Sequence, residues 1–497
     1  MEKKIRVETM MGKKEINYWD HFKTIVEISA FLNHAASEHY RKIGLQYVEV
    51  PEIVGVTGAC ENIDTLFKVG NRLSIPLFIT QTGQLSLEQA LQKFNGVYTV
   101  IHSGRDEEIE DERHLRQFRL TEEEFDCQMV GMKKSNYDDE KMYEALLSHI
   151  ERVTKAMIET ILKNKKNELS KVYGRNVHEL THTLEESYRR ILYEDAVKML
   201  NQNGYPDLRF GDDLKPDHEQ KIVFLLARDK DPLPTFVMKY PKEIKFFNMK
   251  VSSEDERVVL SSDLIFPFSG EGVGSAVREY RGDLLRKRLL DSTMYRLHLQ
   301  RGGRYEEFKW YVDDIIAAGK TNPHAGCGIG NERVIQFILG LKDIRPCSLF
   351  FLMAEQSKDW EEKKQGRLFF FGKKKAVLLS VGRLTNKKKL LPSIKKIVGN
   401  EFSLYTTEGT FKFLKRNGIG STLVYKISQK GKEPNLSGLI KHNLFDLIIN
   451  IPTRERINRE LTDGQLIRKA AVDSGTTIIT DMEVAGNLLK KLSQLNQ

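Results

Sequence analysis

The sequence predicts two domains of different fold class, an α+β domain followed by an α/β domain. The chain of 497 residues is too long for one ordinary hydrophobic core. Up to about residue 350, strand-like runs and long helices follow one another without a regular rhythm, which indicates a largely antiparallel sheet with helices. From residue 376 onward, short apolar strands alternate regularly with helices, which indicates a parallel sheet. We therefore expect domains at 1–356 and 376–497.

The first domain is predicted to begin with an amphipathic helix at 17–40. Its apolar residues recur at helical spacing until Gly44 ends the pattern. Residues 45–50 then form a strand that runs into Pro51. The other predicted elements of this domain are strands at 65–69, 76–80, 98–101, 118–130, 235–239 and 258–266, and helices at 85–94, 139–163, 304–318 and 334–341.

A segment rich in Lys, Glu, Gln and Gly at 357–375 is the predicted linker. The regular alternation follows it. The predicted strands are 376–381, 402–406, 421–425, 444–450 and 476–479, and the predicted helices are 388–398, 408–416, 434–441, 463–474 and 481–494.

Composition indicates a soluble cytoplasmic protein. Hydrophobic residues make up 40% and charged residues 30%. No apolar run approaches the ~20 residues that span a bilayer, and the N-terminus has no apolar stretch of the kind a signal peptide needs. The four cysteines are far apart, which suits a reducing compartment and argues against a structural zinc site. They are Cys60, Cys127, Cys327 and Cys347.

The net charge of +9 raises the question of nucleic-acid binding. Lysines cluster at 163–166, 373–375, 387–389 and 395–396. We expect these clusters on solvated helix faces and in the linker rather than along an RNA track.

The first segment that carries chemistry runs from Ser103 to Glu124. An arginine after a strand, a charged loop and a returning strand would place cations around a triphosphate. Arg105 suits this role because a guanidinium meets phosphate oxygens in pairs and never loses its charge. Phe118 would stack on a purine.

The second segment pairs two carboxylates, Asp263 and Glu271, which are eight residues apart on a strand and turn. Such a pair would share a Mg²⁺ that bridges phosphate oxygens. Arg278 follows and would hold a substrate carboxylate.

The third segment, 323–333, has glycines that open a helix and Arg333 in its first turn, which places a cation and backbone amides at a phosphate. The chain has no GxxxxGK[ST] sequence, so a P-loop is excluded.

In this order the segments resemble the signature motifs of class II aminoacyl-tRNA synthetases. Residues 44–51 resemble motif 1, 105–124 motif 2 and 326–333 motif 3. Within this class, the sequence is similar to asparaginyl-tRNA synthetases. Residues 79–88 resemble their LTxSGQLxLE element, and residues 236–245 resemble their FVxxYPKEIK element. The resemblance covers about residues 18–350.

The resemblance implies an ATP-dependent ligase that forms an aminoacyl-adenylate with ATP and Mg²⁺. Arg105 and Arg333 would be catalytic and hold phosphates. The remaining implied ATP contacts are Glu107, Arg113, His114, Phe118 and Gly330. Gln84 and Arg278 would contact an aspartate- or asparagine-like amino acid, and Asp263 and Glu271 would bind the metal. Pro51 would lie at a homodimer interface.

Departures from the family's sequence pattern leave open which molecule accepts the acyl group of the adenylate. Only about 17 residues precede the core, too few for the family's anticodon-binding barrel, and 310–319 lacks the arginine of WYxDLRRYG. Our leading hypothesis is a tRNA-independent, amide-forming ligase of asparagine-synthetase type, in which ammonia or another amine captures the adenylate. The alternatives are an asparagine–tRNA ligase that uses acceptor-stem contacts alone and a non-catalytic nucleotide sensor.

Residues 376–497 resemble the methylglyoxal-synthase-like domain that also forms the regulatory end of carbamoyl-phosphate synthetase. Stretches at 378–381, 406–410, 431–436 and 449–453 carry this resemblance. It implies a site for a nucleoside monophosphate or another phosphorylated effector, and 431–435 is closer to the regulatory members than to the enzymes. The implied ligand residues are Ser380, Lys388, Thr407, Gly409 and Thr410.

Overall fold

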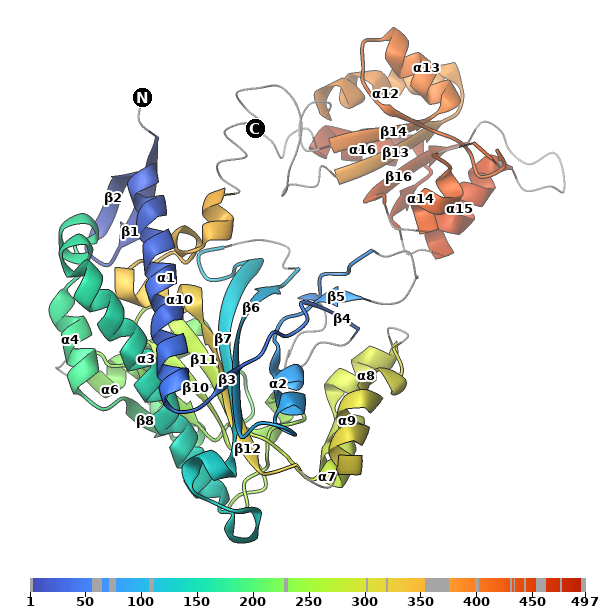
Figure 1. The fold of residues 1–497 in the computed structure, drawn as a ribbon. Coiled ribbons are helices and arrows are strands. Elements are labelled where there is room, and N and C mark those ends of the chain that lie inside the picture. The colour runs from blue at the N-terminus through green and yellow to red at the C-terminus, as the bar shows by residue number, and fades with distance from the viewer. Residues whose placement is uncertain are drawn as a thin grey trace. The chain divides into compact units, whose positions relative to one another are not determined.

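A computed structural model gives the fold (Figure 1). It describes residues 3–55, 65–70, 77–106, 111–227, 231–300, 303–318, 321–353, 375–397, 402–429, 431–432, 434–441, 444–452, 462–473 and 476–492. Contacts divide the chain into two compact units, residues 1–356 and 357–497. The predicted linker lies outside the described residues except for Lys375, which begins a strand.

The first unit is built on an eight-stranded sheet. Its order is β3 (Gln46–Tyr47), β6 (Gly96–Gly104), β7 (Gln117–Asp126), β12 (His324–Gly330), β11 (Gly270–Val277), β10 (Ser261–Phe266), β9 (Thr235–Met238) and β8 (Arg189–Leu192). Neighbouring strands run antiparallel except in the β3–β6 and β8–β9 pairs. The predicted α+β class with a largely antiparallel sheet is confirmed.

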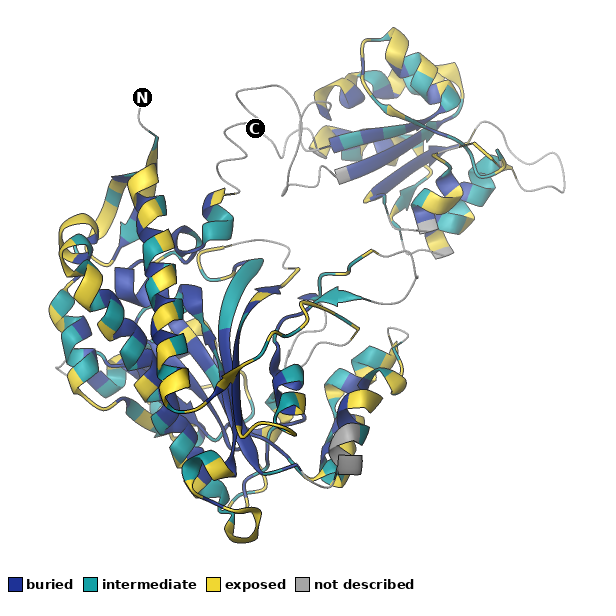
Figure 2. Ribbon diagram, in the orientation of Figure 1, coloured by how far each residue is buried: buried dark blue, intermediate teal, exposed yellow. Residues whose placement is uncertain are grey.

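Two long helices, α1 (Tyr18–Lys42) and α3 (Asp139–Glu168), pack together and share a hydrophobic core with the sheet (Figures 1 and 2). The Asn17 side chain caps α1 by accepting hydrogen bonds from the backbone of Trp19 and Asp20. The other helices are α2 (Gln84–Ala90), α4 (Val177–Glu185), α5 (Tyr193–Asn201), α6 (Pro216–Ala227), α7 (Gly282–Asp291), α8 (Thr293–Gln300), α9 (Glu306–Ala318) and α10 (Asn331–Leu339).

The glycine-rich strands β11 and β12 were not predicted, because glycine is depleted in strands and the pattern also fits a turn. Here the glycines make room for neighbours. A Cβ at Gly326 would collide with the Glu123 carbonyl oxygen and the Glu124 carboxyl group. The structure also has two small two-stranded sheets. These are β1 (Lys4–Thr9) with β2 (Gly12–Asn17), which was not predicted, and β4 (Ile53–Val54) with β5 (Phe78–Ile79).

Some predicted strands are shorter than expected. The strand predicted at 45–50 is reduced to β3, with one further hydrogen bond from the Val48 N–H to the Tyr98 carbonyl oxygen, and the strand predicted at 65–69 makes a bridge at Lys68. Residues 65–70 lie between two stretches outside the described residues.

The second unit contains a five-stranded, all-parallel sheet, which confirms the predicted α/β class. Its order is β15 (Thr422–Val424), β14 (Phe402–Thr407), β13 (Lys375–Val381), β16 (Leu447–Ile451) and β17 (Ile478–Ile479). One core joins a face of this sheet to α12 (Leu384–Ile397), α13 (Glu408–Arg416) and α16 (Met482–Leu492). A second core joins the other face to α14 (Leu436–Lys441) and α15 (Asp463–Asp473).

Among the described residues, no helix is long and apolar enough to cross a membrane. Cys127, Cys327 and Cys347 are buried free thiols, and Cys60 lies outside the described part of the chain.

Candidate active site

Two alternate glutamates of β7, Glu122 and Glu124, lie beside the predicted site residues. Glu124 lies opposite Gly326 of β12, and Glu122 lies opposite Gly328. Glu122 accepts hydrogen bonds from Thr82 Oγ1 at 2.5 Å and from the backbone N–H of Gly83 at 2.7 Å. Burial raises the pKa of Glu122 to about 7, against these hydrogen bonds.

A third glutamate, Glu88 on α2, makes polar contacts with four side chains. Its Oε1 accepts from Gln84 Nε2 and from Asn248 Nδ2, each at 2.7 Å. Its Oε2 accepts from Tyr311 Oη at 2.5 Å and lies 3.3 Å from His324 Nε2. Burial alone would raise the pKa of Glu88, but His324, Arg278 and Tyr311 together hold it below its usual value. The Glu88 carboxylate is therefore an ionised group in the protein interior.

Arg278 is buried beside Glu88. Its Nε and Nη2 donate to Glu124 Oε1 at 3.0 and 2.8 Å, and Nη2 also donates to the Gly326 carbonyl oxygen at 3.3 Å. Its Nε lies 4.0 Å from Glu88 Oε1. The two residues predicted to bind the amino acid, Gln84 and Arg278, are thus brought together around Glu88, which sequence reasoning had not singled out. Its signal was the position four residues after Gln84 on one helix.

The predicted phosphate cations fall into two groups. Arg105 follows β6 and is exposed, with its guanidinium carbon 5.6 Å from the ring centre of Phe118 on β7. His114 is also exposed, and its Nδ1 lies 2.9 Å from Asp111 Oδ1. Glu107 lies outside the described residues.

The second group is more buried. Arg333 donates to the carbonyl oxygens of Ser269 at 2.8 Å and Arg113 at 2.5 Å. Burial, and then the charge of Arg113, lower the pKa of Arg333 to about 10. Arg113 in turn lies 3.4 Å from Glu219. Gly330 caps α10, so the Arg333 guanidinium is set by the first turn of that helix.

The two predicted metal ligands face each other across β10 and β11. Asp263 pairs with Gly274, and a Cβ at that glycine would lie 3.3 Å from Glu271 Oε1 and 3.9 Å from Asp263 Oδ1. Lys245 Nζ lies 2.8 Å from Asp263 Oδ2. Within the described ranges, no three His, Cys, Asp or Glu side chains are grouped closely enough to hold a metal by themselves. The pair fits a Mg²⁺ that takes its other ligands from phosphates and water.

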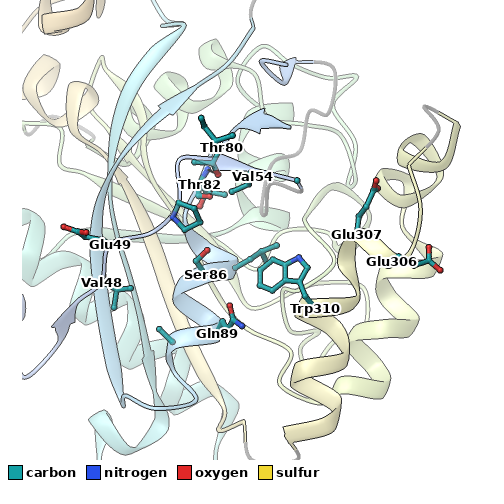
Figure 3. Close-up of a pocket in the computed structure, with 15 residues that line it drawn as sticks. Val48, Glu49, Val54, Thr80, Thr82, Ser86, Gln89, Glu306, Glu307 and Trp310 are labelled. Carbon is teal, nitrogen blue, oxygen red and sulfur yellow. Dashed lines mark hydrogen bonds between the residues drawn. The ribbon is translucent and has the colours of Figure 1, made fainter. Parts of the chain in front are cut away.

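A cavity of about 720 Å³ lies beside the loop that carries Thr82 (Figure 3). Pro51 and Thr80 line it, together with Trp310 from α9. The adjacent Tyr311 instead donates to Glu88, so consecutive residues of α9 line the cavity and bind this buried carboxylate. Pro51 is exposed in the single chain.

In the second unit, the predicted ligand residues meet at the carboxyl ends of β13 and β14. Thr407 Oγ1 lies 3.4 Å from Ser380 Oγ, and Thr410 Oγ1 accepts from the Val381 N–H at 3.2 Å. The lysine of this group is Lys387, whose Nζ donates to the Gly409 carbonyl oxygen at 2.8 Å. Lys388, which the sequence reading had chosen, is exposed one residue further along α12. One residue on a helix corresponds to a rotation of about 100°, which no motif comparison resolves.

Comparisons with known proteins agree with this geometry. A family model for class II tRNA synthetases (D, K and N) matches residues 18–354, and a model for MGS-like domains matches residues 389–480. The asparagine–tRNA ligase of Pyrococcus horikoshii is 31% identical over 327 residues, covering 66% of this chain and 67% of that protein. That of Hahella chejuensis is 28% identical over 351 residues, covering 65% and 68%.

Solved structures give the same result. The asparaginyl-tRNA synthetase of Pyrococcus horikoshii complexed with asparaginyl-adenylate aligns with a TM-score of 0.56 and 30% identity, covering 67% of this chain and 68% of that one. The Entamoeba histolytica enzyme complexed with asparaginyl-adenylate aligns with a TM-score of 0.53 at 22% identity, covering 66% of each chain, which supports the fold alone. This chain therefore belongs to the class II tRNA synthetase family (D, K and N), with a core of the asparaginyl-tRNA synthetase type and a C-terminal MGS-like domain.

Proposed function

We propose that the first unit activates an asparagine-like amino acid as an acyl-adenylate. The observation that carries this proposal is that the paired strands β11 and β12 position both groups, with Arg278 and the ionised Glu88 at one end and Arg333 at the other. In the proposed reaction, a carboxylate oxygen of the amino acid attacks the α-phosphorus of ATP in line. The bond to the bridging oxygen breaks, and pyrophosphate leaves. No proton is transferred in this step, so positioning and charge neutralisation supply the catalysis.

The residues on the phosphate side have distinct proposed roles. Arg105 and Phe118 lie 5.6 Å apart, so the ring would stack on the adenine while the guanidinium reaches the α-phosphate. Arg333 would bind the γ-phosphate, supported by its two carbonyl contacts. Asp263 and Glu271 would hold Mg²⁺, which supplies positive charge to the phosphate oxygens when bound.

The charges in the amino-acid pocket favour an amide side chain over a carboxylate. Arg278 pairs with Glu124 at 2.8 Å and His324 pairs with Glu88 at 3.3 Å, so neither cation is left uncompensated for a second carboxylate, and Glu88 offers an ionised oxygen. An amide donates hydrogen bonds to such an oxygen, but a second carboxylate would be repelled. Glu88→Gln should therefore raise the KM for an amide substrate and narrow the preference over aspartate.

The acceptor of the adenylate has two candidates. Capture by ammonia or another amine would make the protein an amide-forming ligase that does not use tRNA, as the sequence suggests. The asparagine-synthetase form of this reaction starts from aspartate, against the preference for an amide proposed for this pocket. Transfer to tRNA is the second candidate, favoured by the likeness to asparagine–tRNA ligases. A screen of amino acids in ATP–pyrophosphate exchange, followed by product analysis with ammonium or with tRNA, separates the two. Absence of exchange with every amino acid would instead support a non-catalytic nucleotide sensor.

The second unit is proposed to sense a phosphorylated small molecule. This is supported by the hydroxyl groups of Thr407 and Ser380, the turn at Thr410 and the Lys387 ammonium group, which converge at one edge of the sheet. Hydroxyl and amide donors with a single cation suit a phosphomonoester such as a nucleoside monophosphate. We also propose that the protein is a homodimer through the segment that ends at Pro51.

A further inference from the structure

The positive charge of this protein is concentrated in the second unit. Residues 376–497 contain 20 of the 78 Lys and Arg residues but only 10 of the 69 Asp and Glu residues. The net charge of the whole chain is +9, so the rest of the chain is close to neutral. A domain of this size with such an excess attracts polyanions from solution.

The excess lies on one face of the unit. The three helices that cover one side of the sheet, α12, α13 and α16, contain ten Lys and Arg residues but only two glutamates in their sequences. On the opposite side, α15 contains two cations and two aspartates. We name the first side the basic face; it comprises α12, α13 and α16, and Figure 2 shows exposed residues along α12 and α13.

The helical period explains how the lysines of α12 reach this face. Leu390, Ile394 and Ile397 are buried against the sheet. Lys388 and Lys395 are seven residues apart and therefore lie along one line on the outer side of the helix. Lys389 and Lys396 form a second line beside it. These four lysines are exposed, and none of them forms an ion pair with a carboxylate that the structure describes.

The neighbouring helices extend the same face. Lys415 and Arg416 are exposed near the end of α13, and Lys491 is exposed on α16, which packs beside α12. Glu408 neutralises one cation of α13 by pairing with Lys412 at 2.7 Å. The rest of the basic face keeps a large positive excess, and two of the four lysine clusters of the sequence, 387–389 and 395–396, lie on it.

We propose that the basic face binds RNA through its phosphate backbone. A charged membrane is the main competing polyanion, but peripheral membrane helices present large apolar side chains beside their cations. On α12, α13 and α16 the exposed large hydrophobic residues are Leu384 and Val484, each at the start of its helix. A nucleic acid is favoured over a small polyanion because each line of lysines on α12 is about 10 Å long and can follow a row of phosphates. The choice of RNA rests on the second acceptor candidate of the proposed function, tRNA. The described residues of α12, α13 and α16 include no exposed aromatic side chain that could stack on a base. The basic face would therefore contact the phosphates and not the bases.

The test measures binding of the full-length chain to labelled unfractionated tRNA by fluorescence anisotropy over a range of salt concentrations. The parent should bind with an affinity that falls linearly on a log–log plot against salt. The variant Lys388→Glu/Lys389→Glu/Lys395→Glu/Lys396→Glu should lose at least tenfold in affinity, and its salt slope should fall by about 3.

A matched control separates this face from a general effect of charge. Lys13, Lys163, Lys166 and Lys171 are exposed lysines of the first unit, and reversing all four makes the same change in net charge. This control should retain binding close to that of the parent, and both variants should keep the parent's circular dichroism and pyrophosphate exchange. Equal loss in the two variants would overturn the proposal. Tighter binding to vesicles containing phosphatidylserine than to tRNA would also overturn it. RNA binding is measured without ATP or amino acid, so a failure of the exchange reaction would not imitate either result.

Discussion

His324 and Glu88 form an ion pair in the interior of the first unit, with Nε2 and Oε2 3.3 Å apart and each side chain 1% exposed. His324 Nδ1 lies 2.9 Å from the Asn322 carbonyl oxygen, which accepts hydrogen bonds and cannot donate them. Nδ1 therefore carries a proton. Because Glu88 is ionised, Nε2 carries the second proton, and His324 is an imidazolium ion.

The pair predicts a pH-dependent stability of the first unit. Burial would lower the pKa of His324, but Glu88 raises it above its ordinary value. The stabilisation that comes from protonated His324 is then complete below about pH 6.5. It is lost as pH rises through the folded-state pKa of His324. The pKa of Glu88 is lowered, so its own contribution is present above about pH 4.5 and is lost as pH falls.

Tryptophan fluorescence measures this effect mainly in the first unit, because Trp19 and Trp310 belong to it and residues 376–497 contain no tryptophan. The urea midpoint of the parent should fall between pH 7 and pH 9. At pH 6.5 the urea midpoint of His324→Asn should be lower than that of the parent, which corresponds to a loss of about 3 kcal/mol in unfolding free energy. The midpoint of this variant should also change less with pH. If parent and variant showed parallel pH profiles, the imidazolium assignment would be wrong.

Arg333 predicts a loss of catalysis without a loss of fold. Arg333→Ala should slow amino-acid-dependent pyrophosphate exchange by about 2–4 kcal/mol in activation free energy, because it removes a charged donor to the phosphates. Arg257→Ala is the control, since Arg257 is exposed and pairs with Asp255 outside the site. Exchange in Arg333→Ala at the parental rate would refute the assignment.

The metal pair predicts a change in magnesium dependence. Asp263→Asn removes one of the two charges that would attract Mg²⁺ beside the phosphates, so the magnesium concentration for half-maximal exchange should rise at least tenfold. Lys245 would also lose its ion pair with Asp263, so thermal unfolding must be measured in parallel. A magnesium profile identical to that of the parent would exclude Asp263 as a ligand.

Much of this arrangement could be predicted from sequence, because the motif residues lie on long periodic elements. Sequence reasoning missed the pocket itself. Glu122, Glu123 and Glu124 read as a charged run, but on a strand alternate residues face opposite sides. Glu122 and Glu124 reach the site, while Glu123 faces the helices and lies 2.9 Å from His149. Two partners of Glu88, Tyr311 and His324, come from α9 and β12, more than 200 residues away, and sequence spacing carries no information about such contacts.

The segment ending at Pro51 predicts the oligomeric state. Motif 1 supplies the shared interface in class II synthetases, and this chain leaves Pro51 and Ile53 exposed beside the cavity of Figure 3. Light scattering should give the mass of a dimer at micromolar concentrations, and Ile53→Asp should shift the protein toward monomer because it places a charge in an apolar interface. A monomer at every concentration would contradict the prediction.

The site of the second unit predicts binding of a phosphorylated ligand and its effect on the first unit. Isothermal titration calorimetry with IMP, UMP and inorganic phosphate should find a ligand that binds more tightly than millimolar. Burial lowers the pKa of Lys387, which indicates a desolvated ammonium group beside Gly409. Lys387→Ala should therefore weaken binding, whereas the adjacent Lys388→Ala should not, because Lys388 is exposed.

The same ligand should alter pyrophosphate exchange several-fold, since a coupling of about 1–3 kcal/mol is usual between linked sites. The Lys387→Ala variant should keep basal exchange and lose only the response to ligand, which distinguishes regulation from damage to the enzyme. Binding without any change in exchange would leave a phosphate-binding domain that does not regulate this reaction. If none of the three compounds binds more tightly than millimolar, the sensing proposal fails, and the hydroxyl groups of Thr407 and Ser380 then serve only to join β13 to β14.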